Sequence, residues 1–186
     1  MRVIAGKYRG RKLKSPPSIQ TRPTSDRLRE TLFNILAPRI DGRRFLDLCA
    51  GTGAVGIEAL SRGALDVTFV DQSRKMCALI ESNLNSLNVA QSEYQIVPGD
   101  ALGYLRRHVK KGAPPFHNVF FDPPYATDYE MLLNFAGDHV TQILDREGIV
   151  IVEHHKKKLL TDQFQTLTRY RELIQGDSVL GFYRVA

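Results

Sequence analysis

The tetrapeptide Asp122-Pro123-Pro124-Tyr125 places a carboxylate, two prolines and an aromatic ring directly after the apolar run Val119-Phe120-Phe121. That run is typical of a buried strand. The prolines end the strand, because neither can donate a hydrogen bond to a sheet, and they stiffen the backbone. An acid and a ring held at the carboxyl end of a strand lie where open α/β sheets build active sites. The same residues also suit a plain proline turn, so other parts of the chain must decide between the two.

A glycine-rich loop upstream predicts a nucleotide-like ligand. Residues 51–56 read Gly-Thr-Gly-Ala-Val-Gly between a predicted strand and a predicted helix, and Asp71 ends the next apolar run. Taken alone, this pattern is the dinucleotide-binding fingerprint, in which the ligand lies against bare backbone and the acid binds ribose hydroxyls. S-adenosylmethionine also carries an adenosine with a free ribose diol. A dehydrogenase and a methyltransferase therefore both fit this loop.

Three acids and the chain length favour S-adenosylmethionine over NAD. Asp47, just before the loop, suits a ligand with a cationic methionine end better than one with a pyrophosphate. Asp100 follows the third predicted strand, where it is expected to accept a hydrogen bond from an adenine amino group. Asp122 supplies an acid where methyl transfer to an amine needs one. A chain of 186 residues also leaves no room for the substrate domain that most dehydrogenases add.

The elements that must position these residues alternate between strands and helices from Arg44 onward. Strands are predicted over residues 45–48, 67–70, 94–97, 119–121 and 148–152. Helices are predicted from the glycine stretch that ends at Gly56 to about Arg62, and over residues 73–87, 129–144 and 157–164, with a further one near Leu102. A hairpin of residues 167–174 and 179–185 is predicted at the end of the chain. This alternation predicts an α/β fold with a doubly wound, mostly parallel, Rossmann-like sheet.

Positive charge is concentrated in the first quarter of the chain. The net charge is +6, yet residues 1–44 contain 12 Lys and Arg against 3 Asp and Glu, whereas the other residues contain 14 against 17. A segment this basic predicts a polyanionic partner, most often a nucleic acid.

Two stretches of this basic segment are candidates for RNA contact. A hairpin is predicted over residues 3–13, where Tyr8 stands among cations, as aromatic residues do on RNA-contacting surfaces. A helix is predicted from an N-cap at Thr24 or Ser25 to Pro38, and the arginines near its start are placed to hold a phosphate. The predicted RNA-contacting residues are Lys7, Arg9, Arg11, Lys12, Arg22, Arg27 and Arg29.

Composition argues against several other classes of protein. The sequence has no apolar stretch that approaches membrane-spanning length, and its first seven residues lack the apolar core of a signal peptide. Cys49 and Cys77 are too few for a disulfide scaffold or a cysteine zinc site. Glu153, His154 and His155 are neighbours on a predicted strand and point to alternate faces, so no metal site is expected. We therefore expect a cytoplasmic protein.

The motifs together resemble those of class I methyltransferases that modify exocyclic amines. The motifs concerned are residues 47–53, Asp71, residues 99–101 and residues 122–125. The N-terminal stretches 3–6, 9–13, 21–27 and 29–34 further resemble the RsmD family of bacterial 16S ribosomal RNA guanine-N2 methyltransferases. The likeness covers nearly the whole chain and is weakest from Asp138 onward. It implies a seven-stranded sheet with an antiparallel last strand, divided into a basic RNA-contacting extension, 1–43, and a methyltransferase domain, 44–186.

The resemblance also implies roles for individual residues. The implied cofactor-binding residues are Asp47, Ala50, Gly51, Thr52, Gly53, Asp71, Gln72, Asp100 and Ala101, and the implied catalytic residues are Asp122, Pro123, Pro124 and Tyr125. Asp122 and the carbonyl of Pro123 would accept hydrogen bonds from the guanine amine, and Tyr125 would stack on a flipped base. The implied partner of this monomer is 16S ribosomal RNA, naked or within a partly assembled small subunit.

Two other functions remain open on the sequence. The Asp-Pro-Pro-Tyr element is shared with DNA adenine methyltransferases, so methylation of adenine N6 in a nucleic acid is one alternative. The other is an RNA-binding ribosome assembly factor that keeps only a vestigial fold. The intact loop glycines, Asp71 and the tetrapeptide argue against a vestigial site.

Overall fold

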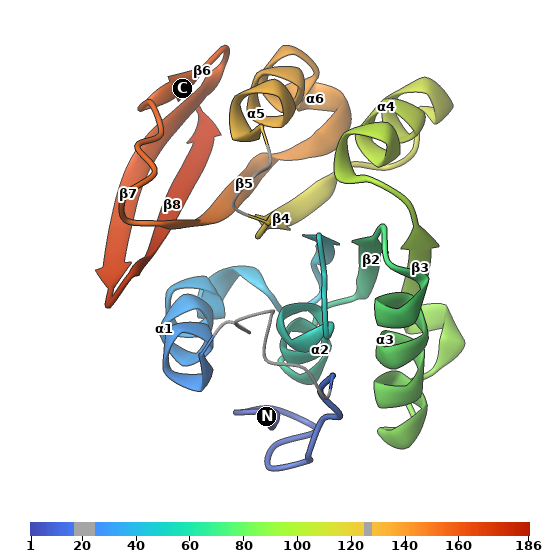
Figure 1. Cartoon of the computed structure of the whole chain (residues 1–186). Helices are drawn as coiled ribbons and strands as arrows, with labels where there is room; N and C mark the ends of the chain where they lie inside the picture. The colour runs from blue at the N-terminus through green and yellow to red at the C-terminus, as the bar shows by residue number, and fades with distance from the viewer. Residues whose placement is uncertain (17–24, 125–127) are drawn as a thin grey trace.

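A mixed sheet forms the centre of the computed structural model, which describes residues 1–16, 25–124 and 128–186 (Figure 1). Within those residues the sheet has eight strands in the order β3-β2-β1-β4-β5-β8-β7-β6. The strands are β1 (Arg44–Leu48), β2 (Asp66–Asp71), β3 (Tyr94–Pro98), β4 (Phe116–Phe121), β5 (Leu144–His155), β6 (Gln163–Phe164), β7 (Leu167–Gln175) and β8 (Ser178–Val185). Strands β1 to β5 are parallel, and β8 runs antiparallel to both β5 and β7. The predicted doubly wound sheet and its C-terminal hairpin are confirmed, and the two-residue β6 is added to the seven strands expected.

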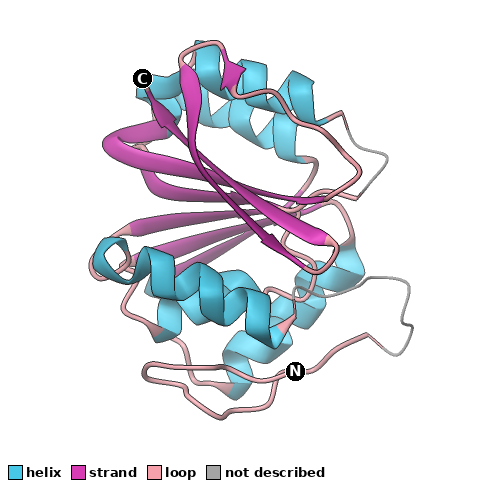
Figure 2. Ribbon diagram, turned by 90° about the vertical axis from the view of Figure 1, so that its left-hand side faces the viewer, coloured by secondary structure: helices cyan, strands magenta, loops and turns pink. Residues whose placement is uncertain are grey.

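Helices cover both faces of the sheet, as Figures 1 and 2 show. The helices are α1 (Asp26–Leu36), α2 (Ala54–Ser61), α3 (Arg74–Ser86), α4 (Ala101–Lys111), α5 (Tyr129–Asp138) and α6 (Val140–Ile143), with 3₁₀ turns η1 (Ala37–Arg39) and η2 (Gln91–Glu93). Apolar residues of α1, α2 and α3 share one buried cluster with the sheet, and those of α4, α5 and α6 share another. The two clusters make the sheet the middle layer of three.

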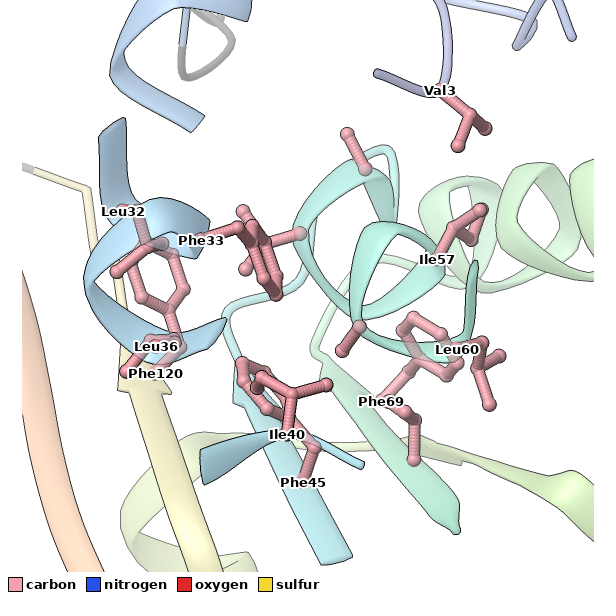
Figure 3. Close-up of a cluster of buried hydrophobic side chains, with 14 of the residues drawn as sticks. Val3, Leu32, Phe33, Leu36, Ile40, Phe45, Ile57, Leu60, Phe69 and Phe120 are labelled. Carbon is pink, nitrogen blue, oxygen red and sulfur yellow. The ribbon is translucent and has the colours of Figure 1, made fainter. Parts of the chain in front are cut away.

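The central strands are buried on both faces. Phe120 belongs to the cluster beneath α1, where Phe33 stacks on Phe45 with ring centroids 6.3 Å apart (Figure 3). Its neighbour Phe121 belongs to the opposite cluster, because successive side chains of a strand point to opposite faces. This double burial explains why the second half of β4, residues 119–121, is a continuous apolar run rather than an alternating one.

The first helix begins and ends as predicted. The hydroxyl oxygen of Ser25 accepts a hydrogen bond of 3.1 Å from the amide of Leu28, so Ser25 is the N-cap. The α-helix ends at Leu36 and passes into η1, which contains Pro38. Thr24, the other predicted cap, lies outside the described residues.

The predicted helix over residues 157–164 is wrong. The chain turns after β5, and Gln163 and Phe164 pair with Thr168 and Leu167 of β7. Leu160 and Phe164 are both buried, a spacing of four that mimics a helical stripe. Phe164 reaches the core as part of a strand instead, against the ring of Tyr183 at a centroid distance of 5.6 Å.

The basic N-terminus forms the predicted hairpin and packs against α2 (Figure 1). Arg2 and Lys12 form an antiparallel bridge. The buried carboxylate of Glu58 accepts hydrogen bonds from the amides of Ile4 at 2.8 Å and Ala5 at 3.0 Å. Gly6 passes so close to α2 that a Cβ on it would lie 1.7 Å from a backbone oxygen. Residues 1–13 therefore share a core with the sheet.

None of the helices in the described parts of the chain is long and apolar enough to cross a membrane.

Candidate active site

The candidate site lies at the carboxyl edge of the parallel strands. The loop that begins at Cys49 follows β1, Asp71 ends β2, Asp100 follows β3 and Asp122 follows β4. Because these four strands are adjacent in the order β3-β2-β1-β4, the predicted acids meet at one edge. The strand order reverses between β1 and β4, which is the point where open α/β sheets bind ligands.

The glycine loop is held in conformations that only glycine adopts easily. Gly51 and Gly53 have φ values of +54° and +74°. Gly53 also caps α2, and a Cβ on it would lie 2.9 Å from the side chain of Ile80. Gly56 serves packing, because a Cβ there would lie 2.3 Å from the ring of Phe69. The loop therefore combines an open backbone at its start with close helix–sheet packing at its end.

Asp71 connects the glycine loop with the start of α3. Its Oδ2 accepts a hydrogen bond of 2.8 Å from the amide of Gly51, and its Oδ1 accepts one of 2.8 Å from the amide of Ser73. A carboxylate oxygen can accept two hydrogen bonds, so both oxygens keep an acceptor position for a ribose diol. Gln72, beside it, is exposed.

Asp47 lies beneath the loop rather than at its surface. The residue is 1% exposed, and its Oδ2 accepts a hydrogen bond of 2.9 Å from the amide of Gly56 in α2. Burial raises the pKa of Asp47 to about 7, and the charge of Asp71 adds to the rise, while the bond from Gly56 opposes it. The structure thus shows Asp47 bound to the Gly56 amide. Its contact with the cationic methionine end of the cofactor stays a prediction.

Asp100 is the N-cap of α4. Its Oδ1 accepts a hydrogen bond of 2.6 Å from the amide of Gly103, and the residue is exposed. A side chain on Gly103 would collide with this carboxylate. Asp100 and the half-buried Ala101 stand at the same edge as Asp71, and the hydrogen bond to an adenine amine stays a prediction.

Asp122 stands half-buried where β4 ends. Its amide donates to the carbonyl of Leu48 at 3.4 Å, which fixes it against β1. Burial raises the pKa of Asp122 well above its usual range, and the charges of Glu153 and Asp47 raise it further. An aspartate in such surroundings takes up a proton more readily than one in water.

The carbonyl of Pro123 is positioned by the next helix. Pro123 is buried, and its carbonyl oxygen accepts a hydrogen bond of 3.4 Å from the hydroxyl of Tyr129. The Tyr129 ring meets Phe121 edge-on at a centroid distance of 5.7 Å. Pro124 is exposed, and Tyr125 lies outside the described residues, so stacking by Tyr125 stays a prediction.

Glu153 is an acid at this edge that the sequence patterns did not assign to the site. They considered Glu153 only together with His154 and His155 as a metal site, argued against that site, and gave Glu153 no other role. Strand alternation was the available signal, because Glu153 follows Ile151 on the same face of β5. Tyr129 was also missed, since nothing in the local pattern connects it to Pro123.

The predicted RNA-contacting residues of the hairpin are exposed. They are Lys7, Arg9, Arg11 and Lys12. The ammonium group of Lys7 lies 5.1 Å from the ring centroid of Tyr8, and the guanidinium of Arg11 donates to the carbonyl of Ser86 at 2.6 Å. Arg27 in α1 is exposed as well, and Arg22 lies outside the described residues.

The prediction that Arg29 contacts RNA is wrong, because its side chain is fully buried and cannot hold a phosphate at the surface. Its guanidinium donates to the carbonyl of Arg2 at 2.6 Å and to Asp26 at 3.0 Å, and lies 3.9 Å from Glu58. Arg29 stands three residues before Leu32 on the buried stripe of α1. It therefore ties the hairpin to α1 and α2.

The fold, the glycine loop with Asp71, and the Asp-Pro-Pro sequence after β4 define a Rossmann-like methyltransferase of class I. A family model described as "Conserved hypothetical protein 95" matches residues 1–184. This chain belongs to that family, which is the RsmD family that its motifs resemble.

Named relatives and a solved structure agree with this family. "Ribosomal RNA small subunit methyltransferase D" of Escherichia coli strain K12 is 37% identical over 99% of this chain and 89% of its own length. The protein of the same name from Haemophilus influenzae is 34% identical over 91% and 86%. A solved structure of the E. coli protein yhhF has a TM-score of 0.85 at 33% identity, covering 100% of this chain and 98% of its own. The protein is thus an S-adenosylmethionine-dependent methyltransferase.

Proposed function

We propose that this protein transfers a methyl group from S-adenosylmethionine to the exocyclic N2 amine of a guanine in 16S ribosomal RNA. The observation that carries the proposal is Asp122 with the Pro123 carbonyl, held at the end of β4 beside the glycine loop that follows β1. The names of the E. coli and H. influenzae relatives support the small-subunit RNA as substrate.

The residues of the loop fit S-adenosylmethionine. Gly51 leaves the backbone bare where a ligand would approach, Gly53 lets the loop pack closely on Ile80, and Asp71 keeps an acceptor position on each oxygen for the ribose hydroxyls. Thr52 and Ala50 complete the loop, and Gln72 follows Asp71. When bound, S-adenosylmethionine would supply an electrophilic methyl group on a sulfonium, and its sulfur would keep the electron pair of the broken methyl–sulfur bond and leave as the neutral thioether of S-adenosylhomocysteine.

Asp122 and Pro123 would act on the guanine amine. The lone pair of this nitrogen is delocalised into the ring, so it is a poor nucleophile until hydrogen bonds steer it toward tetrahedral geometry. The ionised carboxylate of Asp122 accepts one N–H, and the Pro123 carbonyl accepts the other with the lone pair that Tyr129 leaves unused. The nitrogen becomes positive as its bond to the methyl carbon forms, so the nearby carboxylate stabilises the transition state most. The nitrogen then gives up a proton, for which Asp122 is the nearest base among the residues we assign.

The basic extension, 1–43, would bind the RNA, and residues 44–186 would carry out the transfer. The exposed cations Lys7, Arg9, Arg11 and Lys12 lie on a hairpin whose backbone is anchored to α2, so their positions on the surface are fixed where they can neutralise phosphates. We infer a monomer that works in the cytoplasm on naked RNA or on a partly assembled small subunit.

The test is to identify the methylated nucleoside. The protein is incubated with radiolabelled S-adenosylmethionine and small-subunit RNA, both naked and protein-bound, and the RNA is digested and separated. We expect label in N2-methylguanosine. Label in N6-methyladenosine would establish the adenine alternative, and RNA binding without any label would establish the assembly factor.

A further inference from the structure

Glu153 lies beside Asp122 at the carboxyl edge, and the function proposed above assigns it no role. Strands β4 and β5 are parallel, with Phe121 opposite Val152, so Asp122 and Glu153 are the next residues along two neighbouring strands. Phe120 and Ile151, two positions earlier on the same strands, both belong to the cluster beneath α1. Because strand side chains alternate, Asp122 and Glu153 project to this same face.

The environment of Glu153 is unusual for a carboxylate. The residue is 8% exposed, and it follows four buried apolar residues of β5, Ile149 to Val152. Its charge acts on Asp122, where it raises the pKa more than Asp47 does. The charge of Glu153 opposes ionisation of Asp122, so holding both carboxylates ionised costs free energy. A ligand that donates hydrogen bonds to both carboxylates offsets this free-energy cost.

Guanine carries two such donors side by side. Its Watson–Crick edge presents the N1–H next to the N2 amine, and enzymes that act on flipped bases read this edge by hydrogen bonds. Adenine presents an unprotonated N1, an acceptor, at the corresponding place. A carboxylate accepts hydrogen bonds and donates none, so it favours the first base and repels the second.

We propose that Glu153 determines specificity by accepting a hydrogen bond from N1–H of the target guanine while Asp122 binds the N2 amine. This inference rests on the proposed function, since it assumes that the target is a guanine amine. Two adjacent acceptors matched to two adjacent donors explain why the fold keeps an acid at the end of β5. The same two acceptors distinguish this guanine site from an adenine site with a similar Asp-Pro-Pro element, because adenine N1 is an acceptor.

The test replaces the target guanine, once identified, by 2-aminopurine in a synthetic RNA fragment that the wild type methylates. 2-Aminopurine keeps the exocyclic amine but has an unprotonated N1. The wild type is expected to methylate guanine at least about tenfold more efficiently, in kcat/KM, than 2-aminopurine, because the unprotonated N1 offers no donor to the Glu153 carboxylate. Glu153→Gln should lower kcat/KM for guanine and narrow this preference, because its amide can donate to the unprotonated N1.

Controls separate specificity from stability. Glu147→Gln makes the same change at the opposite end of β5 and should keep the wild-type preference. Glu153→Asp keeps the negative charge but moves the carboxylate away from the base, because its side chain is one carbon shorter. It should therefore lower kcat/KM for guanine and keep the preference for guanine over 2-aminopurine. The same variant tests the proposal if Glu153→Gln does not fold. Melting temperature and S-adenosylhomocysteine affinity check that each variant is intact.

The outcomes distinguish the two proposals. If the wild type methylates guanine N2 and Glu153→Gln keeps the full preference over 2-aminopurine, the role of Glu153 is wrong and the proposed function stands. If Glu153→Gln lowers kcat/KM equally for guanine and for 2-aminopurine, Glu153 has only a structural role. If the wild type labels no guanine amine, the proposed function itself fails.

Discussion

The carboxylate of Asp71 and the amide of Gly51 are joined by a hydrogen bond of 2.8 Å, although the two residues lie twenty positions apart. This bond connects the end of β2 with the glycine loop that follows β1. Asp71 therefore holds the loop from one side while its remaining acceptor positions stay available to a ribose. Loop geometry and ligand recognition depend on the same side chain.

We predict that Asp71→Ala weakens S-adenosylmethionine binding by at least about tenfold. The change removes one or two charge-assisted hydrogen bonds, each worth about 1.5–3 kcal/mol, and frees the Gly51 amide. Isothermal titration calorimetry measures the affinity, and circular dichroism confirms that the variant is folded. Unchanged affinity in a folded variant would contradict the assignment, as would tight NAD binding by the wild type.

Asp122→Ala should reduce single-turnover methyl transfer by about a hundredfold to a thousandfold while cofactor affinity stays near the wild-type value. The expected loss is that of a preorganised electrostatic group at the reacting nitrogen. Asp122→Asn keeps the shape and one acceptor oxygen without the charge, so its rate should fall between those of the alanine variant and the wild type. A purely structural aspartate would instead lower the melting temperature and leave the rate per folded molecule unchanged.

Methyl transfer should decline on acidification at a higher pH than an ordinary aspartate would cause. Burial and the charges of Glu153 and Asp47 raise the pKa of Asp122, and the mechanism uses its ionised form. Glu153→Gln removes one of these charges, so the acidic limb of its pH–rate profile for guanine should shift to lower pH, whatever its effect on the maximum. A limb that stays in place would show that Asp122 does not govern it.

The contribution of Asp47 to the stability of the fold should fall as the pH rises from about 4 to about 7. Its folded pKa is raised from 3.8 to about 7, so the folded state holds a proton that the unfolded state has already released. The stabilising contribution is fully present below the unfolded pKa and is lost as the pH rises through the folded one. Asp47→Asn should therefore gain stability relative to the wild type over this interval, as measured by urea unfolding at each pH. A difference between the two proteins that does not change with pH would contradict the raised pKa.

Replacing Arg9, Arg11 and Lys12 together by alanine should weaken RNA binding and flatten its salt dependence. The slope should fall by about one unit for each phosphate that the variant no longer neutralises. Cofactor affinity should survive, because the backbone of the hairpin is held by its bonds to Glu58, and the only bond described for these three side chains is the one from Arg11 to Ser86.

The matched control removes three positive charges from α4 on the other face of the sheet, through Arg106→Ala, Lys110→Ala and Lys111→Ala. It should leave RNA affinity close to that of the wild type. If the hairpin variant retains both the affinity and the salt slope of the wild type, the basic segment does not bind RNA.

Arg29→Met should destabilise the protein by about 3–5 kcal/mol, because it leaves the buried Glu58 without one of its cations. Glu58 keeps its bond to Arg62 at 2.7 Å, so the hairpin remains attached in the folded fraction. RNA affinity per folded molecule should therefore stay at the wild-type value. Urea unfolding and RNA titration of the same sample measure the two effects separately.

The sequence by itself determined the features that depend on local chemistry. Apolar runs predicted the buried strands, glycine spacing predicted the loop of Gly51 and Gly53, and the two prolines predicted that β4 ends just before them, at Phe121. These features are readable because backbone freedom, hydrogen-bonding capacity and strand alternation are properties of neighbouring residues.

Only the tertiary structure decided which residues meet. Arg27 and Arg29 read alike in the sequence, yet one is exposed and the other is buried against Glu58, because the docked hairpin and α2 cover one side of α1. Phe164 lies in β6 rather than in a helix, because pairing with β7 and packing on Tyr183 outweigh its local spacing. Glu153 joins Asp122 only through the adjacency of β4 and β5. Burial and pairing depend on partners distant in the chain, and local sequence patterns carry no information about them.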